Sequence, residues 1–470
     1  MGHLIRVFAA ILLLLASCTN AKKEASSGYD FSEIMEKDTL RILTLNTSTS
    51  YFIYRDQPMG YHYDMVKDFC RQHNLVPEII IAQNAAAMVD LLQAEKADMI
   101  AYPIPLQNRL KDSLIYCGLQ QITHQVLVQR AEATDTLLSD VTQLIGKQVT
   151  VLNGSQYEQR MQNLNEELGG GIDIRTADKD TIILEDLIRM VSEGEIRYTV
   201  ANNYLAKLNQ TYYRNIDINL QVSFDQRSSW VVTKNRPVLA DSLNRWFEQR
   251  NTQPTYSQIT KRYFEETKRS AFYSPPTTMI NLQTGQISPF DTYFKHYGDL
   301  FGIDWRLLTS MAYYESSFDP LAEAWTGAGG LMGLMPSTAE TVGVSISHLF
   351  DPEQNIRGGT RYLKRLLDTF SSVKDPSERL KLALAAYNGG IGHVSDARAL
   401  AQKYQADKNV WSGNVERYLQ LKRLQLYYED PVCQFGYFRS DETVNYVKNV
   451  MAQWQSYKEK TDDSAPRIKK

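Results

Sequence analysis

The sequence predicts an α/β domain followed by a mainly α domain. Between residues 39 and 268, short aliphatic and β-branched runs alternate with helical patterns, which is typical of a parallel sheet covered by helices. Beyond residue 289, apolar residues recur at helical spacing instead. A chain of 470 residues is also too long for one ordinary core, so we expect at least two domains.

The individual elements follow the same division. In the first domain we expect strands at residues 40–45, 78–82, 99–103 and 149–152, and helices at 65–73 and 85–94. In the second domain we expect helices at residues 290–301, 305–314, 356–370, 380–387, 415–428 and 443–457. Pro and Gly breakers mark a linker at residues 269–288, which places the second domain at 289–455 and a charged tail at 456–470.

The N-terminus has the pattern of an export signal. Arg6 precedes an unbroken apolar run at residues 7–16. This run is too short to span a bilayer as a helix and has the length of a signal-peptide core. A buried N-terminal helix is the alternative, but a surface helix normally has polar positions and this run has none.

A lipid anchor is expected directly after this signal. The run Leu15-Ala16-Ser17-Cys18 resembles a bacterial lipobox, which implies a signal peptide at 1–17, lipidation of Cys18 and a polar tether at 18–38. Thr19 stands where inner-membrane lipoproteins tend to carry Asp. We therefore expect a lipid-anchored protein on the periplasmic face of the outer membrane.

Composition excludes several function classes. The net charge is near −3, so there is no basic excess that would attract nucleic acid. The seven histidines are dispersed and show neither an HExxH motif nor the Cys/His spacing of a metal site. We expect no nucleic-acid partner, no metal and no cofactor.

Glu315 is the strongest candidate for chemistry. Leu307, Met311 and Glu315 recur at four-residue spacing and form one apolar stripe of a helix. Such a stripe faces a core or a cleft, so the carboxyl group is partly removed from water and its pKa rises. A general acid that works near neutral pH needs this shift. The alternative is a glutamate at an exposed helix end, where most glutamates lie.

Five short motifs follow one another in the second half of the chain. They are Glu315-Ser316, Gly327-Ala328 with Gly330-Leu331-Met332, Asp351-Pro352 with Asn355-Ile356 and Gly359-Thr360, Ala385-Tyr387-Asn388-Gly389, and Glu442-Thr443 with Tyr446. Together they resemble the goose-lysozyme-like lytic transglycosylases, which cut the glycan strand of peptidoglycan. The resemblance implies a lysozyme-like fold, Glu315 as the catalytic residue, and a saccharide cleft lined by Gly330, Met335, Tyr387, Asn388 and Tyr446. Read locally, Tyr387 and Asn388 end a helix, and Tyr446 is an ordinary core aromatic.

The implied reaction needs one carboxylate, whereas most glycosidases use two. By analogy, Glu315 protonates the oxygen between N-acetylmuramic acid and N-acetylglucosamine, then acts as base on the muramyl C6 hydroxyl to give a 1,6-anhydro end. Two positions depart from the usual pattern, because Gly333 replaces a common Gln and Ala324 replaces a common Ser. These departures leave open a non-catalytic cell-wall sensor with a degenerate lytic domain.

The first domain resembles the family-3 extracellular solute-binding proteins over residues 39–268. The motifs that carry this are Gly60-Tyr61-His62-Tyr63-Asp64, Asp98-Met99-Ile100-Ala101, Asn108-Arg109, Gly146-Lys147-Gln148-Val149 and Asn153-Gly154-Ser155. The resemblance implies a two-lobed periplasmic-binding-protein type II fold, with a ligand site at Tyr51, Asp64, Tyr102, Arg109, Gly154 and Ser155. In it, Arg109 holds a carboxylate and Gly154-Ser155 adds donors at a helix N-terminus. Read locally, Arg109 is a solvated surface residue, Asp64 is a helix N-cap and Ser155 is a plain cap.

The ligand of this domain is expected to be an amino acid or a muropeptide. Asn202 takes the place of an Asp that usually pairs with the ligand's ammonium group in that family, which argues against ordinary amino acids. Chain crossings near residues 125–129 and 230–233 are the expected hinge between the lobes. Closure on a ligand would then supply a two-state element that regulates the second domain.

Overall fold

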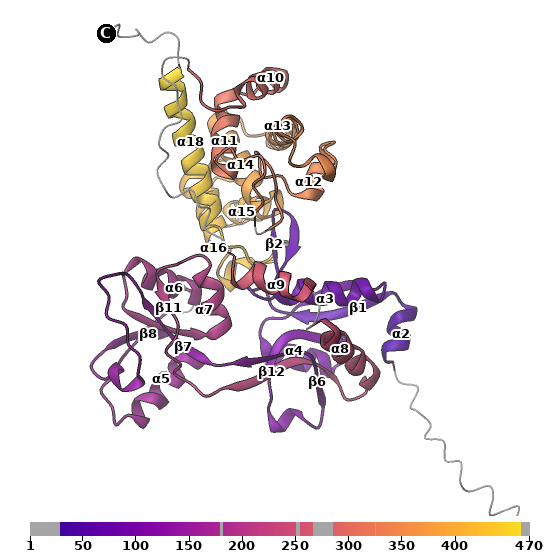
Figure 1. The fold of residues 1–470 in the computed structure, drawn as a ribbon, viewed down its shortest axis with the longest axis vertical. Coiled ribbons are helices and arrows are strands. Elements are labelled where there is room, and N and C mark those ends of the chain that lie inside the picture. Colours follow the sequence, from indigo (N-terminus) through magenta and orange to yellow (C-terminus); the bar gives the residue numbers. More distant parts are fainter. Residues whose placement is uncertain (1–28, 179–181, 251–253, 267–284, 325, 462–470) are drawn as a thin grey trace, which may run out of the picture.

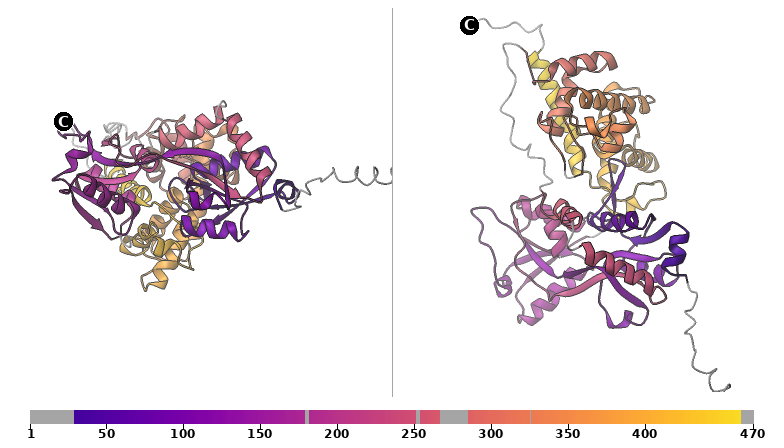
Figure 2. Two further views of the ribbon diagram at one scale, coloured as in Figure 1. Left: turned by 90° about the horizontal axis from the view of Figure 1, so that it is seen from below. Right: turned by 45° about the vertical axis from the view of Figure 1, so that its right-hand side comes forward.

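The computed structural model describes residues 29–178, 182–250, 254–266, 285–324 and 326–461. The expected signal peptide, Cys18 and most of the expected linker lie outside these residues. In the described part of the chain, no helix combines the length and the apolar character that crossing a membrane requires. A two-lobed α/β domain and a mostly helical domain lie end to end (Figures 1 and 2).

Lobe 1 is built on a five-stranded sheet with the order β4-β1-β5-β12-β6. Its strands are β1 (Thr39–Thr44), β4 (Val76–Ile81), β5 (Met99–Pro105), β6 (Leu114–Thr123) and β12 (Gln226–Thr233). Its helices are α2 (Phe31–Glu36), α3 (Tyr61–Gln72), α4 (Ala85–Gln93), α8 (Pro237–Arg250) and α9 (Pro254–Phe264). The expected parallel pairing is confirmed for β1 with β4 and β5. Strand β12 is antiparallel to both of its neighbours, β5 and β6, because it brings the chain back from lobe 2 in the direction opposite to that in which β6 leaves lobe 1.

Lobe 2 has a separate core between two small sheets and three helices. Its strands are β7 (Gln125–Arg130), β8 (Gln148–Leu152), β9 (Asp173–Ala177), β10 (Tyr198–Asn202) and β11 (Ile216–Asp217). Its helices are α5 (Gln156–Glu167), α6 (Leu184–Glu193) and α7 (Asn203–Gln210). Asn202 ends β10, which is the position predicted for it.

The chain crosses between the lobes at His124, where β6 ends and β7 begins, and again just before β12. At this crossing His124 Nδ1 lies 3.0 Å from Asp225 Oδ1. The hinge expected at 125–129 therefore begins one residue after the observed crossing and lies inside β7. The expected hinge at 230–233 is wrong, since these residues lie within β12 and pair with β6 in the sheet of lobe 1.

A two-stranded hairpin leaves lobe 1 and enters the helical domain. It consists of β2 (Phe52–Tyr54) and β3 (Gln57–Met59), and Figure 1 shows β2 rising among the helices of the second domain. The turn residues Arg55 and Asp56 have φ of +48° and +58°. Two left-handed residues are typical of the turn that suits a two-residue hairpin. The strands are too short to give a sequence signal, and no strand was expected here.

The helical domain packs around one hydrophobic core. Its helices are α10 (Asp291–Phe301), α11 (Trp305–Ser316), α12 (Pro336–Thr341), α13 (Pro352–Thr369), α14 (Pro376–Gly389), α15 (Ile391–Lys403), α16 (Glu416–Leu421), α17 (Gln425–Tyr428) and α18 (Asp441–Thr461). The four expected helices at 290–301, 305–314, 356–370 and 380–387 are confirmed as α10, α11, α13 and α14. No helix was expected at the positions of α12 and α15.

Two expectations at the end of the domain need correction. The single helix expected at 415–428 is broken into α16 and α17, because the Lys422 carbonyl accepts an N–H from Phe438 instead of continuing the helix. The last helix, α18, also continues to Thr461, so ordered structure extends past residue 455, where the expected tail was to begin.

Candidate active site

Glu315 lies in the last turn of α11, and its side chain is only 6% exposed. Ser316 Oγ donates to the Leu331 carbonyl at 3.0 Å, which ties this end of α11 to the Gly-rich segment 327–335. Burial raises the pKa of the Glu315 carboxyl group, while the positive charge of Arg55 and the Tyr446 hydroxyl oppose that rise. The predicted desolvated carboxylate is therefore present in the fold.

Asn355 holds the Gly-rich segment in place. Its Oδ1 accepts from Met332 N at 2.7 Å, and its Nδ2 donates to the Gly329 and Leu349 carbonyls at 3.0 and 2.7 Å. A Cβ on Gly330, which has φ of +77°, would lie 2.3 Å from Asn355 Nδ2. Gly330 is thus required by the close approach of this amide. The motif containing Asn355 was recognised in the sequence, but no role was assigned to it.

Three of the other predicted saccharide residues, Tyr387, Asn388 and Tyr446, lie near Glu315. The Tyr387 hydroxyl donates to the Met332 carbonyl at 2.8 Å, and Thr443 Oγ1 donates to Asn388 Oδ1 at 2.7 Å. Tyr446 lies next to Glu315, yet within the described residues its hydroxyl and Glu315 Oε1 make no hydrogen bond of ordinary geometry. Met335 is buried at the N-cap of α12.

The hairpin of lobe 1 places Arg55 on the candidate acid. Arg55 Nη2 lies 2.9 Å from Glu315 Oε2, Nη1 donates to the Gly333 carbonyl at 2.6 Å, and Nε donates to the Asn388 carbonyl at 3.0 Å. The Arg55 side chain is only 10% exposed, so this is a buried ion pair. Sequence reasoning missed Arg55, because 260 residues separate it from Glu315 and no local pattern links them.

Asp56, the second turn residue, holds the hairpin against α15. Its carboxylate oxygens accept from the backbone N–H groups of Ile391 and Gly392, both at 3.0 Å. An ionised carboxylate at a helix N-terminus is favoured by the helix dipole. A Cβ on Gly390 would lie 2.8 Å from Asp56 N, so a glycine is needed where the hairpin enters.

The two departures from the family pattern have different structural meanings. A Cβ on Gly333, which has φ of +57°, would lie 2.2 Å from Glu315 Oε2. The glycine therefore makes room for the carboxylate in its contact with Arg55. Ala324 is exposed, and its carbonyl accepts from Gly327 N at 2.8 Å in a turn of the backbone.

The predicted ligand residues of lobe 1 have mixed outcomes. The expected N-cap role of Asp64 is wrong, because α3 begins at Tyr61 and its N-cap is Gly60. The Asp64 carboxylate instead accepts from the Tyr263 hydroxyl at 2.8 Å and lies 3.4 Å from Arg262 Nη1. Burial raises its pKa.

Tyr51, Tyr102 and Arg109 complete the lobe 1 set. Tyr51 packs edge-on against Tyr63 with ring centroids 5.3 Å apart. Tyr102 interacts through its hydroxyl with Tyr204 of lobe 2. Arg109 is in the short 3-10 turn Asn108–Leu110, but its side chain lies outside the described residues. A role of these residues in ligand binding stays a prediction.

Gly154 and Ser155 act locally in lobe 2. Ser155 is the N-cap of α5, where its Oγ accepts from Glu158 N at 3.2 Å and donates to the Leu152 carbonyl at 2.6 Å. Gly154 N donates to Glu158 Oε2 at 2.7 Å. These contacts are those of the plain cap that was the alternative interpretation.

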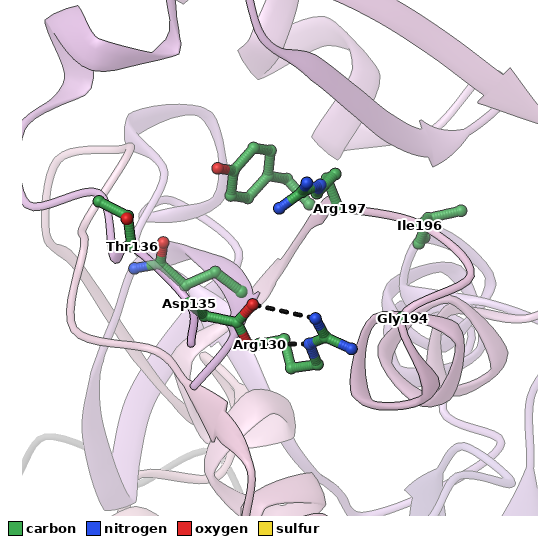
Figure 3. A pocket seen from close by; sticks show the side chains of 8 residues that line it. Arg130, Asp135, Thr136, Gly194, Ile196 and Arg197 are labelled. Atoms are coloured by element: carbon green, nitrogen blue, oxygen red, sulfur yellow. Dashed lines mark hydrogen bonds and ion pairs between the residues drawn. The ribbon is translucent and has the colours of Figure 1, made fainter. Parts of the chain in front are cut away.

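A separate pocket of about 140 Å³ lies on lobe 2, away from the predicted ligand residues. Figure 3 shows that Arg130 and Asp135 face each other in it, and Arg130 Nε and Nη2 donate to the two carboxylate oxygens at 2.8 and 2.9 Å. The Arg130 fork is thus already used by an internal partner.

Lobe 2 also binds the helical domain directly. The Arg439 guanidinium lies 4.3 Å above the Tyr212 ring and donates to the Tyr213 hydroxyl at 2.8 Å. Arg423 Nε lies 3.2 Å from Asp186 Oδ2. The two lobes thus contact the helical domain at different places. Lobe 1 does so through the hairpin and through the Gln83 carbonyl, which accepts from Gln425 Nε2 at 3.5 Å, and lobe 2 does so through these arginines.

Two family models match the chain. Residues 292–411 match the Transglycosylase SLT domain, and residues 40–266 match the bacterial extracellular solute-binding proteins, family 3. The fold and the site together define a peptidoglycan lytic transglycosylase with an N-terminal solute-binding domain.

Similar whole proteins are also known. The membrane-bound lytic murein transglycosylase F of Desulfosudis oleivorans is 31% identical over 91% of this chain and 92% of that protein, and the one of Aliivibrio fischeri is 30% identical over 98% and 91%. The chain belongs to the family of the membrane-bound lytic murein transglycosylases F.

Among solved structures, the first domain is similar to two solute-binding proteins. An ancestral cationic amino acid solute-binding protein has 19% identity and a TM-score of 0.42, covering 50% of this chain and 99% of that one. The substrate binding domain 2 of Lactococcus lactis GlnP has 17% identity and a TM-score of 0.42, covering 49% and 97%.

Proposed function

We propose that Glu315 alone serves as acid and then as base in cutting the bond between N-acetylmuramic acid and N-acetylglucosamine. Its buried carboxyl group with a raised pKa is the observation that carries this role. The protonated form donates to the glycosidic oxygen as the bond breaks. The resulting carboxylate takes the proton of the muramyl C6 hydroxyl, whose oxygen closes onto C1 to give a 1,6-anhydro end. Tyr446, Tyr387, Asn388, Gly330 and Met335 form the proposed saccharide cleft around it.

Digestion of purified sacculi tests this reaction. The whole protein should release anhydromuropeptides, detected by mass analysis, and Glu315→Gln should lower their yield by at least about a hundredfold, because general acid–base catalysis contributes that much or more. Glu340→Gln, at an exposed glutamate of the same domain, is the matched control and should keep the wild-type yield. Reducing-end products would instead indicate hydrolysis, in which Glu442, whose pKa responds to the charges of Arg55 and Glu315, would be the second carboxylate.

We propose that the arrangement in this structure, with the hairpin on Glu315, is the inactive state of a regulated enzyme. Arg55 fills the space beside the Glu315 carboxylate, where the glycosidic oxygen would have to lie. Its positive charge also favours the ionised carboxylate, whereas the first step needs the protonated form. The hairpin therefore opposes catalysis both by volume and by charge.

Ligand binding in the first domain would move this hairpin. The lobes contact each other through Ser48 Oγ, which donates to Glu185 Oε1 at 2.9 Å, and each lobe holds the helical domain at its own contact. A change in the angle between the lobes must therefore shift the hairpin relative to the cleft, or break the contacts of lobe 2. The proposed ligand is an amino acid or a muropeptide.

Removal of the arginine tests the regulation. Arg55→Ala should digest sacculi about tenfold faster than the wild type, because a buried cross-interface ion pair contributes at least the equivalent of one decade. Added muropeptides should accelerate the wild type and leave Arg55→Ala unchanged. Arg71→Ala, at an exposed arginine of lobe 1, is the control. Equal rates for all three proteins would show that the hairpin does not restrain the enzyme.

Attachment to the outer membrane through lipidated Cys18 is also proposed, on the lipobox-like sequence alone. The family name supports association with the membrane. Cys18→Ser should move the protein from the outer-membrane fraction of a cell lysate to the soluble periplasmic fraction. An unchanged distribution, or recovery with the inner membrane, would contradict the anchor or its location.

A further inference from the structure

The hairpin sits on a short segment of the helical domain, residues 388–393, which offers both donors and acceptors. Arg55 N donates to the Gly389 carbonyl at 3.3 Å, and His393 Nε2 contacts the Ile53 carbonyl at 2.8 Å. The N–H groups of residues 391 and 392 hold the Asp56 carboxylate, as described above. The segment thus binds a peptide carbonyl, a peptide N–H and a carboxylate at once.

His393 is prepared as a donor by groups behind it. Lys422 is fully buried, contacts the Asp396 carboxylate and donates to His393 Nδ1 at 2.9 Å. An ammonium group can only donate, so Nδ1 must be the acceptor and the ring proton must be on Nε2. Burial and the Lys422 charge both lower the pKa of His393, which keeps the ring neutral. Its N–H therefore points at the place that the Ile53 carbonyl fills, and this carbonyl is its acceptor within the described residues.

This segment is linked to Glu315 through Arg55, which donates to the Asn388 carbonyl at 3.0 Å. Asp56 and Arg55 are adjacent in the chain, and Arg55 reaches Glu315. A muramyl sugar placed at Glu315 carries a peptide on its lactyl group, and that peptide has carbonyls, N–H groups and free carboxylates. These are the same groups that the hairpin presents to residues 388–393.

We propose that residues 388–393 form a binding subsite for the stem peptide of the substrate, and that the hairpin occupies this subsite in the inactive state. The inference rests on the proposed lytic function of Glu315. It predicts that the enzyme prefers glycan strands that carry peptides over bare strands. It also explains why the turn that covers the site carries the acidic residue Asp56 and not an apolar side chain.

The test compares one protein on two substrates: intact sacculi, and sacculi stripped of stem peptides by an N-acetylmuramoyl-L-alanine amidase. Docking of the hairpin lowers both rates by the same factor, so the ratio of the initial rates reports the subsite. The wild type should cut intact strands about tenfold faster than bare strands, as expected for a charge-assisted hydrogen-bond set.

Two variants remove single donors of the subsite. Ile391→Pro deletes one N–H at the first position of α15, where proline is well tolerated, and its control Ile391→Ala keeps the N–H. His393→Leu deletes the side-chain donor. His393→Gln keeps a side-chain N–H at this position. Asp56→Asn changes the hairpin and leaves the subsite intact.

The ratio should fall toward one in Ile391→Pro and His393→Leu, recover in part in His393→Gln, and stay at the wild-type value in Ile391→Ala and Asp56→Asn. A wild-type ratio near one would overturn the subsite while the lytic function stands. A ratio that stays at the wild-type value in both Ile391→Pro and His393→Leu would also overturn the subsite. If neither substrate yields anhydro products with any variant, the proposed function fails and the subsite with it.

Discussion

Among the described residues, the buried ion pairs Lys422–Asp396 and Arg55–Glu315 differ in the domains that supply their members and in how fully their polar atoms are hydrogen-bonded. Lys422 and Asp396 both belong to the helical domain, and Asp396 also accepts the N–H groups of Gln434 and Phe435, both at 2.9 Å. Glu315 pairs with an arginine from another domain. Within the described residues its second oxygen, Oε1, makes no hydrogen bond of ordinary geometry, although the Tyr446 hydroxyl lies next to the carboxylate and lowers its pKa.

This difference is the one expected between a pair that fixes the structure and a pair with the functional role proposed for Glu315 and Arg55. A buried charge that is fully paired and hydrogen-bonded fixes a structure, whereas one left partly unpaired is held at a cost. Burial lowers the pKa of Lys422, but the Asp396 charge and hydrogen bond oppose that shift. Burial raises the pKa of Glu315, and among the described residues the cation that opposes this rise is Arg55, which the proposed regulation would remove with the hairpin.

The largest effect is expected at the structural pair. Lys422→Met leaves the Asp396 carboxylate buried without its cation and should lower the free energy of unfolding of the helical domain by about 3–5 kcal/mol. The urea midpoint measures this change. Lys364→Met removes an exposed pair with Asp368 and should change stability by less than about 1 kcal/mol. Similar losses in the two variants would contradict the structural role of Lys422.

A pH effect is expected at the functional pair. As the pH falls through the raised pKa of Glu315, protonation removes the negative charge that Arg55 holds, so docking of the hairpin weakens. The rate ratio of Arg55→Ala to wild type should therefore be about tenfold near pH 8 and shrink toward one as the pH approaches the usual glutamate range near pH 4.5. Initial rates on sacculi measure it. A ratio that is independent of pH would show that the ion pair does not hold the hairpin.

The smallest effect is expected at Gly333. Gly333→Ala places a Cβ 2.2 Å from Glu315 Oε2 in the proposed inactive state and should therefore displace the hairpin. Amide exchange across residues 52–59 should then become several times faster. Gly343→Ala is the matched control. It also has a positive φ, so it shares a backbone cost of about 1 kcal/mol, but its nearest neighbour would be 3.5 Å away. Equal exchange rates in the two variants would show that the close contact between the new Cβ and Glu315 does not displace the hairpin.

Much of the fold could be predicted from local patterns. The strand runs around β1 and β5 and the helical stripe of α11 depend on apolar periodicity, which is a property of neighbouring residues. The elements that were missed give little such signal. The strands β2 and β3 have three residues each, and α15 follows α14 across a single glycine, so the sequence showed only a helix end there.

The candidate site divides in the same way. Glu315, Tyr387, Asn388 and Tyr446 were identified from motifs, and the structure brings them together. Arg55, Asp56 and His393 were not identified. Each is an ordinary polar residue in its own segment, and its role arises only from the residue that it meets in another domain.

The sequence by itself determined two domain classes and a desolvated glutamate on a helix, because periodicity and residue chemistry are encoded within a few turns of chain. Only the tertiary structure decided that this glutamate is covered by an arginine 260 residues away. That contact depends on how the two lobes pack against the helical domain and on where a short hairpin leaves its sheet. No local spacing records such a relation, since the free energy that holds it is spread over the interfaces of separately folded cores.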